Sequence, residues 1–265
     1  MTPLRVLVAC ECSGVVREAF RALGCDAWSC DLKLAEDGSP YHIQGDALNA
    51  IRRGCPTDGR PWNLVIAHPP CTRLSNSGVL RLYIDGKKVN GRDSGKFDEM
   101  RRGARFFYSF FVAARLAGSA LCVENPVQHG HAMEAHGQGR PTQIIQPWQF
   151  GDDASKATGL WLRGLHCLRS LSSERWANPR YVCRACGNTY APGVGDAWRD
   201  MKGSVRCNRC GELMLSRWAN QTDSGQNRLA PSKHRAADRA RTYTGIAQAM
   251  AEQWTAYLAS THAKT

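Results

Sequence analysis

Short apolar runs alternate with helix-like segments over the first 165 residues, and this alternation limits the fold more than any other feature. Strand-like runs lie at 5–9, 26–30, 64–67, 120–123, 144–145 and 160–162. Apolar residues recur at helical spacing over 15–23 and 99–117. Strands that alternate with helices predict an α/β fold, in which a mostly parallel sheet carries helices on both faces.

Beyond residue 165 the composition changes. Residues 166–241 hold 14 Lys and Arg against 6 Asp and Glu, which is +8 of the net charge of +12. Apolar residues at helical spacing return over 242–260. We therefore predict an α/β domain at 1–165, an insert at 166–224 and a C-terminal segment at 225–265 that packs back on the first domain. The excess of basic residues favours a polyanionic partner.

Whether the twelve cysteines form disulfides depends on the compartment in which the chain folds. The first apolar run leads straight into Glu11 without a cleavage-site pattern, so we interpret it as a strand and not a signal peptide. No apolar stretch approaches the roughly 18 residues of a membrane span. We expect a cytoplasmic chain without membrane contact, whose cysteines are reduced, metal-bound or catalytic. The cysteines predicted to be buried apolar residues are Cys10, Cys25, Cys30, Cys122 and Cys167.

Four cysteines have the spacing of a zinc ribbon. Cys183 and Cys186 form one Cys-x-x-Cys pair, Cys207 and Cys210 form a second, and a glycine follows each pair. Four thiolates suit a closed, tetrahedral structural Zn²⁺ site. Two disulfides or free thiols are the alternative. Zinc would supply folding energy to a segment with few apolar runs.

The strongest candidate nucleophile is Cys71, in the sequence HPPCTRLS directly after the strand expected at 64–67. Sheets of this class place reactive groups at the carboxyl ends of their strands. Two prolines restrict the backbone before the thiol. A rigid loop with an inert cysteine remains the alternative.

Glu124 opens the sequence ENP, directly after the strand expected at 120–123. It would lie near Cys71 if the two strands are neighbours. A buried carboxyl group can have a raised pKa and donate a proton near neutral pH. A helix cap or a salt-bridged Glu is the alternative reading.

Together, strand-PPC and strand-ENP resemble the PPCQ and ENV motifs of the cytosine-5 DNA methyltransferases. Residues 8–17 are similar to the first motif of that family, residues 156–162 stand at its basic motif and strand, and residues 242–254 resemble its last motif. The ordered motifs resemble the short, phage-type members. The resemblance implies a class I methyltransferase-like, Rossmann-like sheet.

The resemblance implies S-adenosyl-L-methionine as cofactor. Asp31 corresponds to the acidic residue that holds the ribose hydroxyls, and Asp46 to the acidic residue near the adenine. The implied cofactor-binding residues are Cys10, Glu11, Cys12, Ser13, Gly14, Asp31, Leu32, Asp46, Pro69 and Gly245. From the residues alone, Glu11 is equally compatible with a cap on the following helix.

The resemblance also implies the catalytic residues Cys71, Glu124 and Lys156. The Cys71 thiolate would attack carbon 6 of a flipped cytosine. Glu124 would hydrogen-bond or protonate the ring nitrogen and contact the exocyclic amine, and carbon 5 would take the methyl group. A thiol suits this reaction because it attacks reversibly and leaves afterwards. The polar stretch 80–96 is expected to be a mobile loop that closes over the site.

The insert stands where this family has its target-recognition domain. Its arginines and tryptophans suit phosphate contact and groove insertion, although any single arginine is equally compatible with a solvated surface. The implied DNA-binding residues are Arg73, Ser75, Arg184, Arg206, Arg209 and Arg228. A monomer acting on DNA is the default for this class.

Several positions depart from the family pattern. Glu11 and Ser13 replace glycines, Thr72 replaces the Gln after the nucleophile, and Lys156 stands where arginines are usual. The alternatives are a different transferred group from a modified S-adenosylmethionine, a free cytosine nucleotide as substrate, and a non-catalytic DNA-binding protein.

Overall fold

A computed structural model describes residues 2–79, 82, 95–171, 180–183, 185–190, 197–201, 204–222, 229 and 241–262. The chain divides into two compact units. The first contains Met1–Ile145, Ala157–Arg169 and Thr242–Thr265, and the second contains Gln146–Lys156 and Ser170–Arg241. The C-terminal helix therefore groups with the sheet, while the segment 146–156 groups with the second unit.

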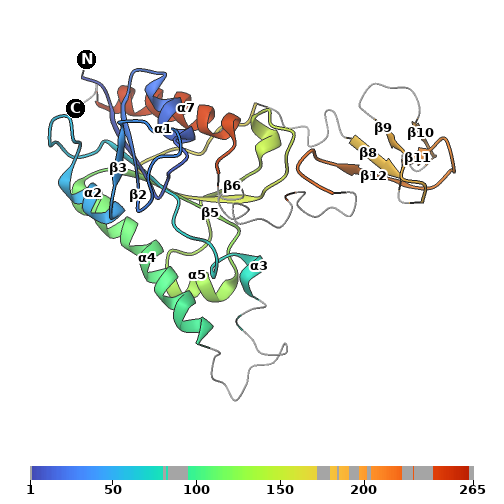
Figure 1. Ribbon diagram of the computed structural model, residues 1–265, viewed down its shortest axis with the longest axis horizontal. Helices are drawn as coiled ribbons and strands as arrows, with labels where there is room; N and C mark the ends of the chain where they lie inside the picture. Colours follow the sequence, from blue (N-terminus) through green and yellow to red (C-terminus); the bar gives the residue numbers. More distant parts are fainter. Residues whose placement is uncertain are drawn as a thin grey trace. The chain divides into compact units, whose positions relative to one another are not determined.

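The first unit is built on a seven-stranded sheet with the order β3-β2-β1-β4-β5-β7-β6 (Figure 1). Its strands are β1 (Arg5–Ala9), β2 (Asp26–Asp31), β3 (His42–Gln44), β4 (Leu64–Ala67), β5 (Ala120–Pro126), β6 (Gln143–Ile145) and β7 (Thr158–Arg163). Strands β1 to β5 are parallel, and β7 runs antiparallel to both of its neighbours. The predicted α/β class with a mostly parallel sheet is confirmed.

Helices lie on both faces of this sheet (Figure 1). The described helices of the first unit are α1 (Val15–Arg21), α2 (Ala47–Arg53), α3 (Asn76–Val79), α4 (Lys96–Ala117), α5 (Gly130–His136) and α7 (Thr244–His262). A 3-10 helix, η2 (Pro147–Phe150), belongs to the second unit. Helix α1 packs against α7, whereas α4 packs against α2 and α5. Residues 80–96, expected to form a closing loop, lie outside the described residues apart from Leu82, Gly95 and Lys96.

Aromatic residues fill the core between the sheet and α4. Phe107 of α4 packs edge-on against Trp161 of β7, and both side chains are fully buried. Trp62 is also buried, and its indole N–H donates to the Ala50 carbonyl at 2.9 Å. A close-packed core of this kind gives the loops at the strand ends a rigid base.

None of the twelve cysteines forms a disulfide. Cys25, Cys30 and Cys122 are buried as predicted, but Cys10 is half-buried and Cys167 is exposed. The prediction of burial is wrong for these two, because Cys10 stands in the loop after β1 and Cys167 in the segment after β7. No helix in the described ranges is long and apolar enough to cross a membrane.

The described part of the second unit contains a core of buried side chains and five short strands. They are β8 (Arg180–Cys183), β9 (Thr189–Tyr190), β10 (Ala197–Arg199), β11 (Val205–Cys207) and β12 (Met214–Arg217). Antiparallel pairing gives the sheets β12-β8-β9 and β10-β11. The core consists of Cys183, Tyr190, Val205, Cys207 and Met214.

The segment Gln146–Lys156 belongs to this second unit because it bonds to residues around Trp218. The rings of Trp148 and Trp218 stack at an interplanar angle of 7°. The backbone N–H of Ser155 donates to the Asn220 side chain at 3.1 Å, and Asn220 donates back to the Ser155 carbonyl at 3.0 Å. These contacts join positions far apart in sequence, which periodicity does not reveal.

Candidate functional site

Strands β1, β4 and β5 end at one edge of the sheet, which we call the carboxyl edge. Strand order reverses between β1 and β4, since β2 and β3 lie on one side and β4 and β5 on the other. Open α/β sheets bind their ligands at the carboxyl ends of strands beside such a reversal. Strands β4 and β5 are neighbours. Glu124 lies in β5 and Cys71 lies in the turn after β4, so the condition for the two residues to lie near each other is met.

Cys71 lies in a tight turn. Its carbonyl accepts hydrogen bonds from the backbone N–H groups of Leu74 at 2.9 Å and Ser75 at 3.0 Å. Pro69 before it is buried, and the thiol-bearing residue itself is half-buried. The turn therefore holds the Cys71 backbone while leaving part of the residue accessible.

Side chains from the end of β5 and the segment after it fasten this turn. Asn125 donates from Nδ2 to the Pro69 carbonyl at 2.7 Å, and Gln128 donates to Asn125 Oδ1 at 3.3 Å. Gln128 accepts in turn from Nε2 of His136, at 2.8 Å. These three residues were not singled out as site residues from the sequence, and the one available signal was the position of Asn125 inside the ENP motif.

Backbone hydrogen bonds strengthen the same connection. The N–H of Asn76 donates to the Val127 carbonyl at 3.1 Å, and the N–H of His129 donates to the Leu74 carbonyl at 3.1 Å. His129 also donates from Nε2 to the Arg73 carbonyl at 2.8 Å. The Cys71 turn, the end of β5 and the segment after β5 thus form one hydrogen-bonded structure.

The stability of this structure is expected to depend on pH through His136. Burial lowers the pKa of His136 to about 4, from 6.5. Its Nδ1 accepts a hydrogen bond from the Gln138 N–H at 3.0 Å. Protonation of Nδ1 would replace this hydrogen bond by two donors that point at each other. Between about pH 6.5 and 4 the unfolded chain binds more protons, and the free energy of unfolding should fall by up to a few kcal/mol as pH drops.

Urea denaturation at pH 7 and pH 5, followed by tryptophan fluorescence, measures this effect. His136→Gln retains an amide donor for Gln128 but does not titrate, so its free energy of unfolding should change less with pH. Burial also lowers the pKa of His129. The variant should therefore keep a smaller pH dependence of the same sign. An equal pH dependence in the wild-type chain and the variant would contradict the assignment.

Glu124 is buried and pairs with a residue that sequence reasoning did not single out. Its Oε2 lies 2.8 Å from Nδ1 of His68, and their side chains are 8% and 9% exposed. This contact has the distance of a salt bridge, which is one of the alternatives that the sequence left open for Glu124. His68 stands directly after β4, so the contact joins the ends of the two central strands.

The residues expected to bind a cofactor lie mostly at the ends of β1, β2 and β3. Cys10 follows β1, Asp31 ends β2, and Asp46 follows β3 and caps α2 by accepting from the Asn49 N–H at 2.8 Å. Burial raises the pKa of Cys10 to about 12, with the charge of Asp31 as the second cause. Cys10 therefore stays a neutral thiol.

Glu11 caps α1, as its alternative interpretation proposed. Its Oε1 accepts from the Val16 N–H at 2.9 Å and from the Ser13 hydroxyl at 3.2 Å. Gly14 precedes the helix at φ +75°, where a Cβ would collide with the Arg17 guanidinium. The positive φ favours glycine there, and any larger residue would also displace the Arg17 guanidinium.

Other expected site residues have varied surroundings. Cys12 lies 3.5 Å from a Glu36 oxygen, Leu32 is exposed, and Gly245 lies in the first turn of α7. Lys156 belongs to the second unit, where its N–H donates to Gln146 at 2.9 Å. Cys71 and Glu124 belong to the first unit.

The candidate DNA-contacting residues also differ. Arg73 donates to Glu99 at 2.7 Å, and Ser75 is buried in a β-bridge with Gln128. Arg206 donates to Asp200 at 3.0 Å, and Arg209 is exposed. Arg184 and Arg228 lie outside the described residues.

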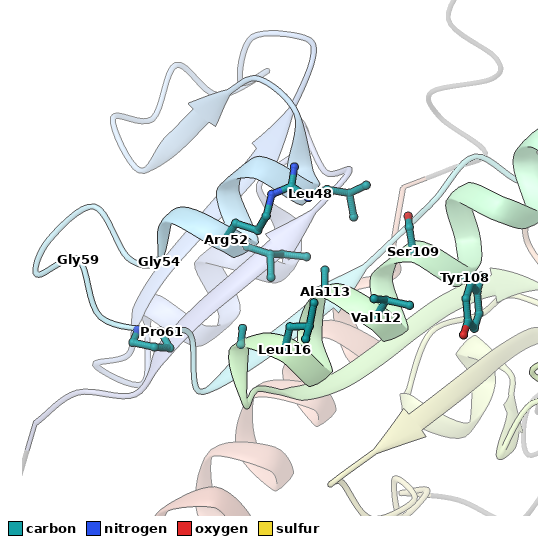
Figure 2. Close-up of a pocket in the computed structure, with 12 residues that line it drawn as sticks. Leu48, Arg52, Gly54, Gly59, Pro61, Tyr108, Ser109, Val112, Ala113 and Leu116 are labelled. Atoms are coloured by element: carbon teal, nitrogen blue, oxygen red, sulfur yellow. The ribbon is translucent and has the colours of Figure 1, made fainter.

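A cavity of about 500 Å³ lies between α2 and α4 (Figure 2). Leu48, Tyr108 and Val112 contribute to its lining, as do Pro61 and Ala117, which precede β4 and β5. The cavity therefore lies toward the amino ends of these strands, opposite the edge that carries Cys71 and Glu124. It is separate from the candidate site.

Four cysteines of the second unit could hold a metal ion such as zinc. All four Sγ atoms lie within 4.8 Å of one another. Cys183 and Cys210 are 3.4 Å apart, and Cys186 is 3.6 Å from Cys207 and from Cys210. Tetrahedral Zn–S bonds of about 2.3 Å imply S–S distances near 3.8 Å, whereas a disulfide needs about 2.05 Å. The spacing fits a metal better than disulfides.

Backbone N–H groups favour the thiolate form of two of these cysteines, Cys183 and Cys207. The N–H of Cys186 points at Cys183 and lowers the pKa of that thiol. Burial opposes ionisation of Cys207, but the N–H groups of Cys210 and Arg209 outweigh it and lower the pKa of Cys207 to about 6. Thiolates are the form that binds zinc.

Comparison with known proteins adds no assignment. No protein-family model matches this chain, and no curated protein matches it.

Proposed function

We propose that this chain is a DNA cytosine-5 methyltransferase that uses S-adenosyl-L-methionine. One observation carries the proposal: Glu124 lies near the carboxyl end of β5, and Cys71 lies in the turn that follows the neighbouring parallel strand β4. Hydrogen bonds fasten that turn to β5 and to the loop after it. A thiol and a buried carboxyl group at one edge are the two groups that attack on carbon 6 requires.

The sheet supports the same proposal. The order β3-β2-β1-β4-β5 is that of the first five strands of the doubly wound nucleotide-binding sheet. Asp31 and Asp46, at the ends of β2 and β3, would hold the ribose hydroxyls and lie near the adenine. When bound, S-adenosyl-L-methionine would supply an electrophilic methyl group at this edge.

The chain's own residues would carry the remaining chemistry. The Cys71 thiolate would bond to carbon 6 of a flipped cytosine, and Glu124 would hydrogen-bond or protonate the ring nitrogen that gains electron density. After transfer to carbon 5, a base removes the carbon-5 proton and the bond to Cys71 breaks. Lys156, at the position of the family's basic motif, is the third proposed catalytic residue.

The chain would act on DNA as a monomer, and the second unit would be its target-recognition insert. Cys183, Cys186, Cys207 and Cys210 would hold a structural Zn²⁺, and basic residues around them would contact phosphate. The proposed DNA contacts are Arg73, Ser75, Arg184, Arg206, Arg209 and Arg228.

Mass spectrometry of nucleosides tests the reaction. Duplex DNA incubated with the chain and S-adenosyl-L-methionine is expected to yield 5-methylcytosine, and Glu124→Gln should lower its rate of formation by about 10²-fold or more. A larger group on cytosine would indicate another donor, and modification of free cytidine monophosphate without DNA modification would indicate a nucleotide substrate. DNA binding without any modified base would favour the non-catalytic alternative.

A further inference from the structure

His68 has one satisfied and one unsatisfied ring nitrogen. Nδ1 lies 2.8 Å from Oε2 of Glu124. Among the buried side-chain nitrogen and oxygen atoms that the structure describes, Nε2 of His68 is the one without a hydrogen-bond partner. Buried polar atoms nearly always have a partner, so an exception at a reactive edge points to a ligand.

The position of His68 supports that reading. It is the first residue after β4, and its backbone N–H donates to the Ala9 carbonyl of β1 at 2.9 Å. The residue therefore lies between the two strands at which strand order reverses, three positions before Cys71. A bound ring that reaches Cys71 and Glu124 would come to the same place.

The partner of Nδ1 determines what Nε2 can do. A carboxylate oxygen accepts hydrogen bonds, so Nδ1 carries the proton and donates it to Glu124. In the neutral imidazole the other nitrogen is then an acceptor. With Glu124 as the carboxylate and His68 in this tautomer, a ligand N–H or O–H group satisfies Nε2.

We propose that Nε2 of His68 accepts a hydrogen bond from the 4-amino group of the bound cytosine, while Nδ1 positions Glu124. This inference rests on the proposed function. Cytosine offers a donor at this position, whereas thymine and uracil offer a carbonyl oxygen. His68 would thus select cytosine, because an acceptor facing Nε2 leaves two lone pairs opposed.

Two isosteric variants of His68 distinguish the role of Nδ1 from the role of Nε2. His68→Asn keeps a donor at the place of Nδ1 and removes Nε2, whereas His68→Gln places an amide oxygen at the position of Nε2. The measured quantity is the second-order rate constant for covalent capture of DNA. One DNA carries 5-fluorocytosine at the target, and the other carries 5-fluoropyrimidin-2-one, which lacks the amino group.

His68→Asn is expected to lower capture of 5-fluorocytosine DNA by about 10- to 100-fold, and capture of the pyrimidinone DNA by less than about threefold. His68→Gln should recover part of the loss on 5-fluorocytosine. A variant that folds poorly loses capture of both DNAs equally, so the ratio of the two rate constants reports the contact alone. His166→Asn is the matched control, since His166 follows β7 and packs on Tyr257.

An unchanged ratio of rate constants in His68→Asn would overturn the proposal, whether both rates fall together or neither falls. A wild-type chain that captures neither DNA would overturn the proposed function, and this inference with it. Capture by the wild-type chain with an unchanged ratio in the variant overturns the role of His68 alone.

Discussion

Replacing Cys71 by serine is expected to abolish covalent capture of DNA that contains 5-fluorocytosine, with a loss of at least about 10³-fold in rate. A hydroxyl group ionises far less readily than a thiol and leaves carbon 6 less readily. With S-adenosyl-L-methionine present, methyl transfer would leave fluorine at carbon 5 in place of the proton that a base removes. The bond to Cys71 could then not break by elimination, so the wild-type adduct should persist and be visible as a slower band in a denaturing gel.

The control for this variant is Cys167→Ser, which makes the same change at an exposed cysteine of the same unit. Capture by that variant should match the wild-type chain. The nucleophile would be misassigned if Cys71→Ser still formed the adduct. Peptide mapping of the wild-type adduct should identify the peptide that contains Cys71.

Loss of one ligand from the four-cysteine cluster is expected to release the metal and unfold the second unit. Cys207 is fully buried and packs with Tyr190 and Met214 in the core of the second unit. Structural zinc contributes about 10–16 kcal/mol to the folding of zinc-finger peptides. A core that contains the ligands Cys183 and Cys207 is therefore expected to depend on the ion. Cys207→Ser should retain less than one tenth of the wild-type zinc.

Elemental analysis measures zinc per chain, and limited proteolysis measures the unfolding. The variant should be cleaved rapidly within 170–241, while the sheet unit stays resistant. Cys55→Ser is the control, because the buried Cys55 thiol donates to Asp26 at 3.1 Å and a hydroxyl can replace that donor. Full zinc content in Cys207→Ser, or unchanged resistance to proteolysis, would contradict the metal-dependent core.

Local patterns predicted the elements of the sheet unit well. The strands expected at 5–9 and 64–67 match β1 and β4, and the helix expected at 99–117 matches most of α4. Strand β3 was missed because three residues without apolar alternation give no periodic signal. The segment 146–156 was assigned to the sheet domain because its contacts with residues around Trp218 are invisible in a linear sequence.

The candidate site was predicted only in part. Cys71 and Glu124 stood out because each follows an apolar strand in a distinctive motif. His68, Gln128 and His136 did not stand out, because a lone histidine or glutamine carries no signal until its partner is known. Glu11 had two interpretations, and its hydrogen bond to the Val16 N–H establishes the cap on α1.

The sequence by itself determined which segments form strands and helices, which thiols pair in Cys-x-x-Cys motifs and where the basic charge concentrates. These properties depend on neighbours within a few residues, so periodicity and spacing carry them. Only the tertiary structure decided that β4 and β5 are neighbours, that Asn125 bonds to Pro69 and that Glu124 bonds to His68. The residues of each pair are 56 positions apart, and packing of the sheet alone brings them within hydrogen-bond distance.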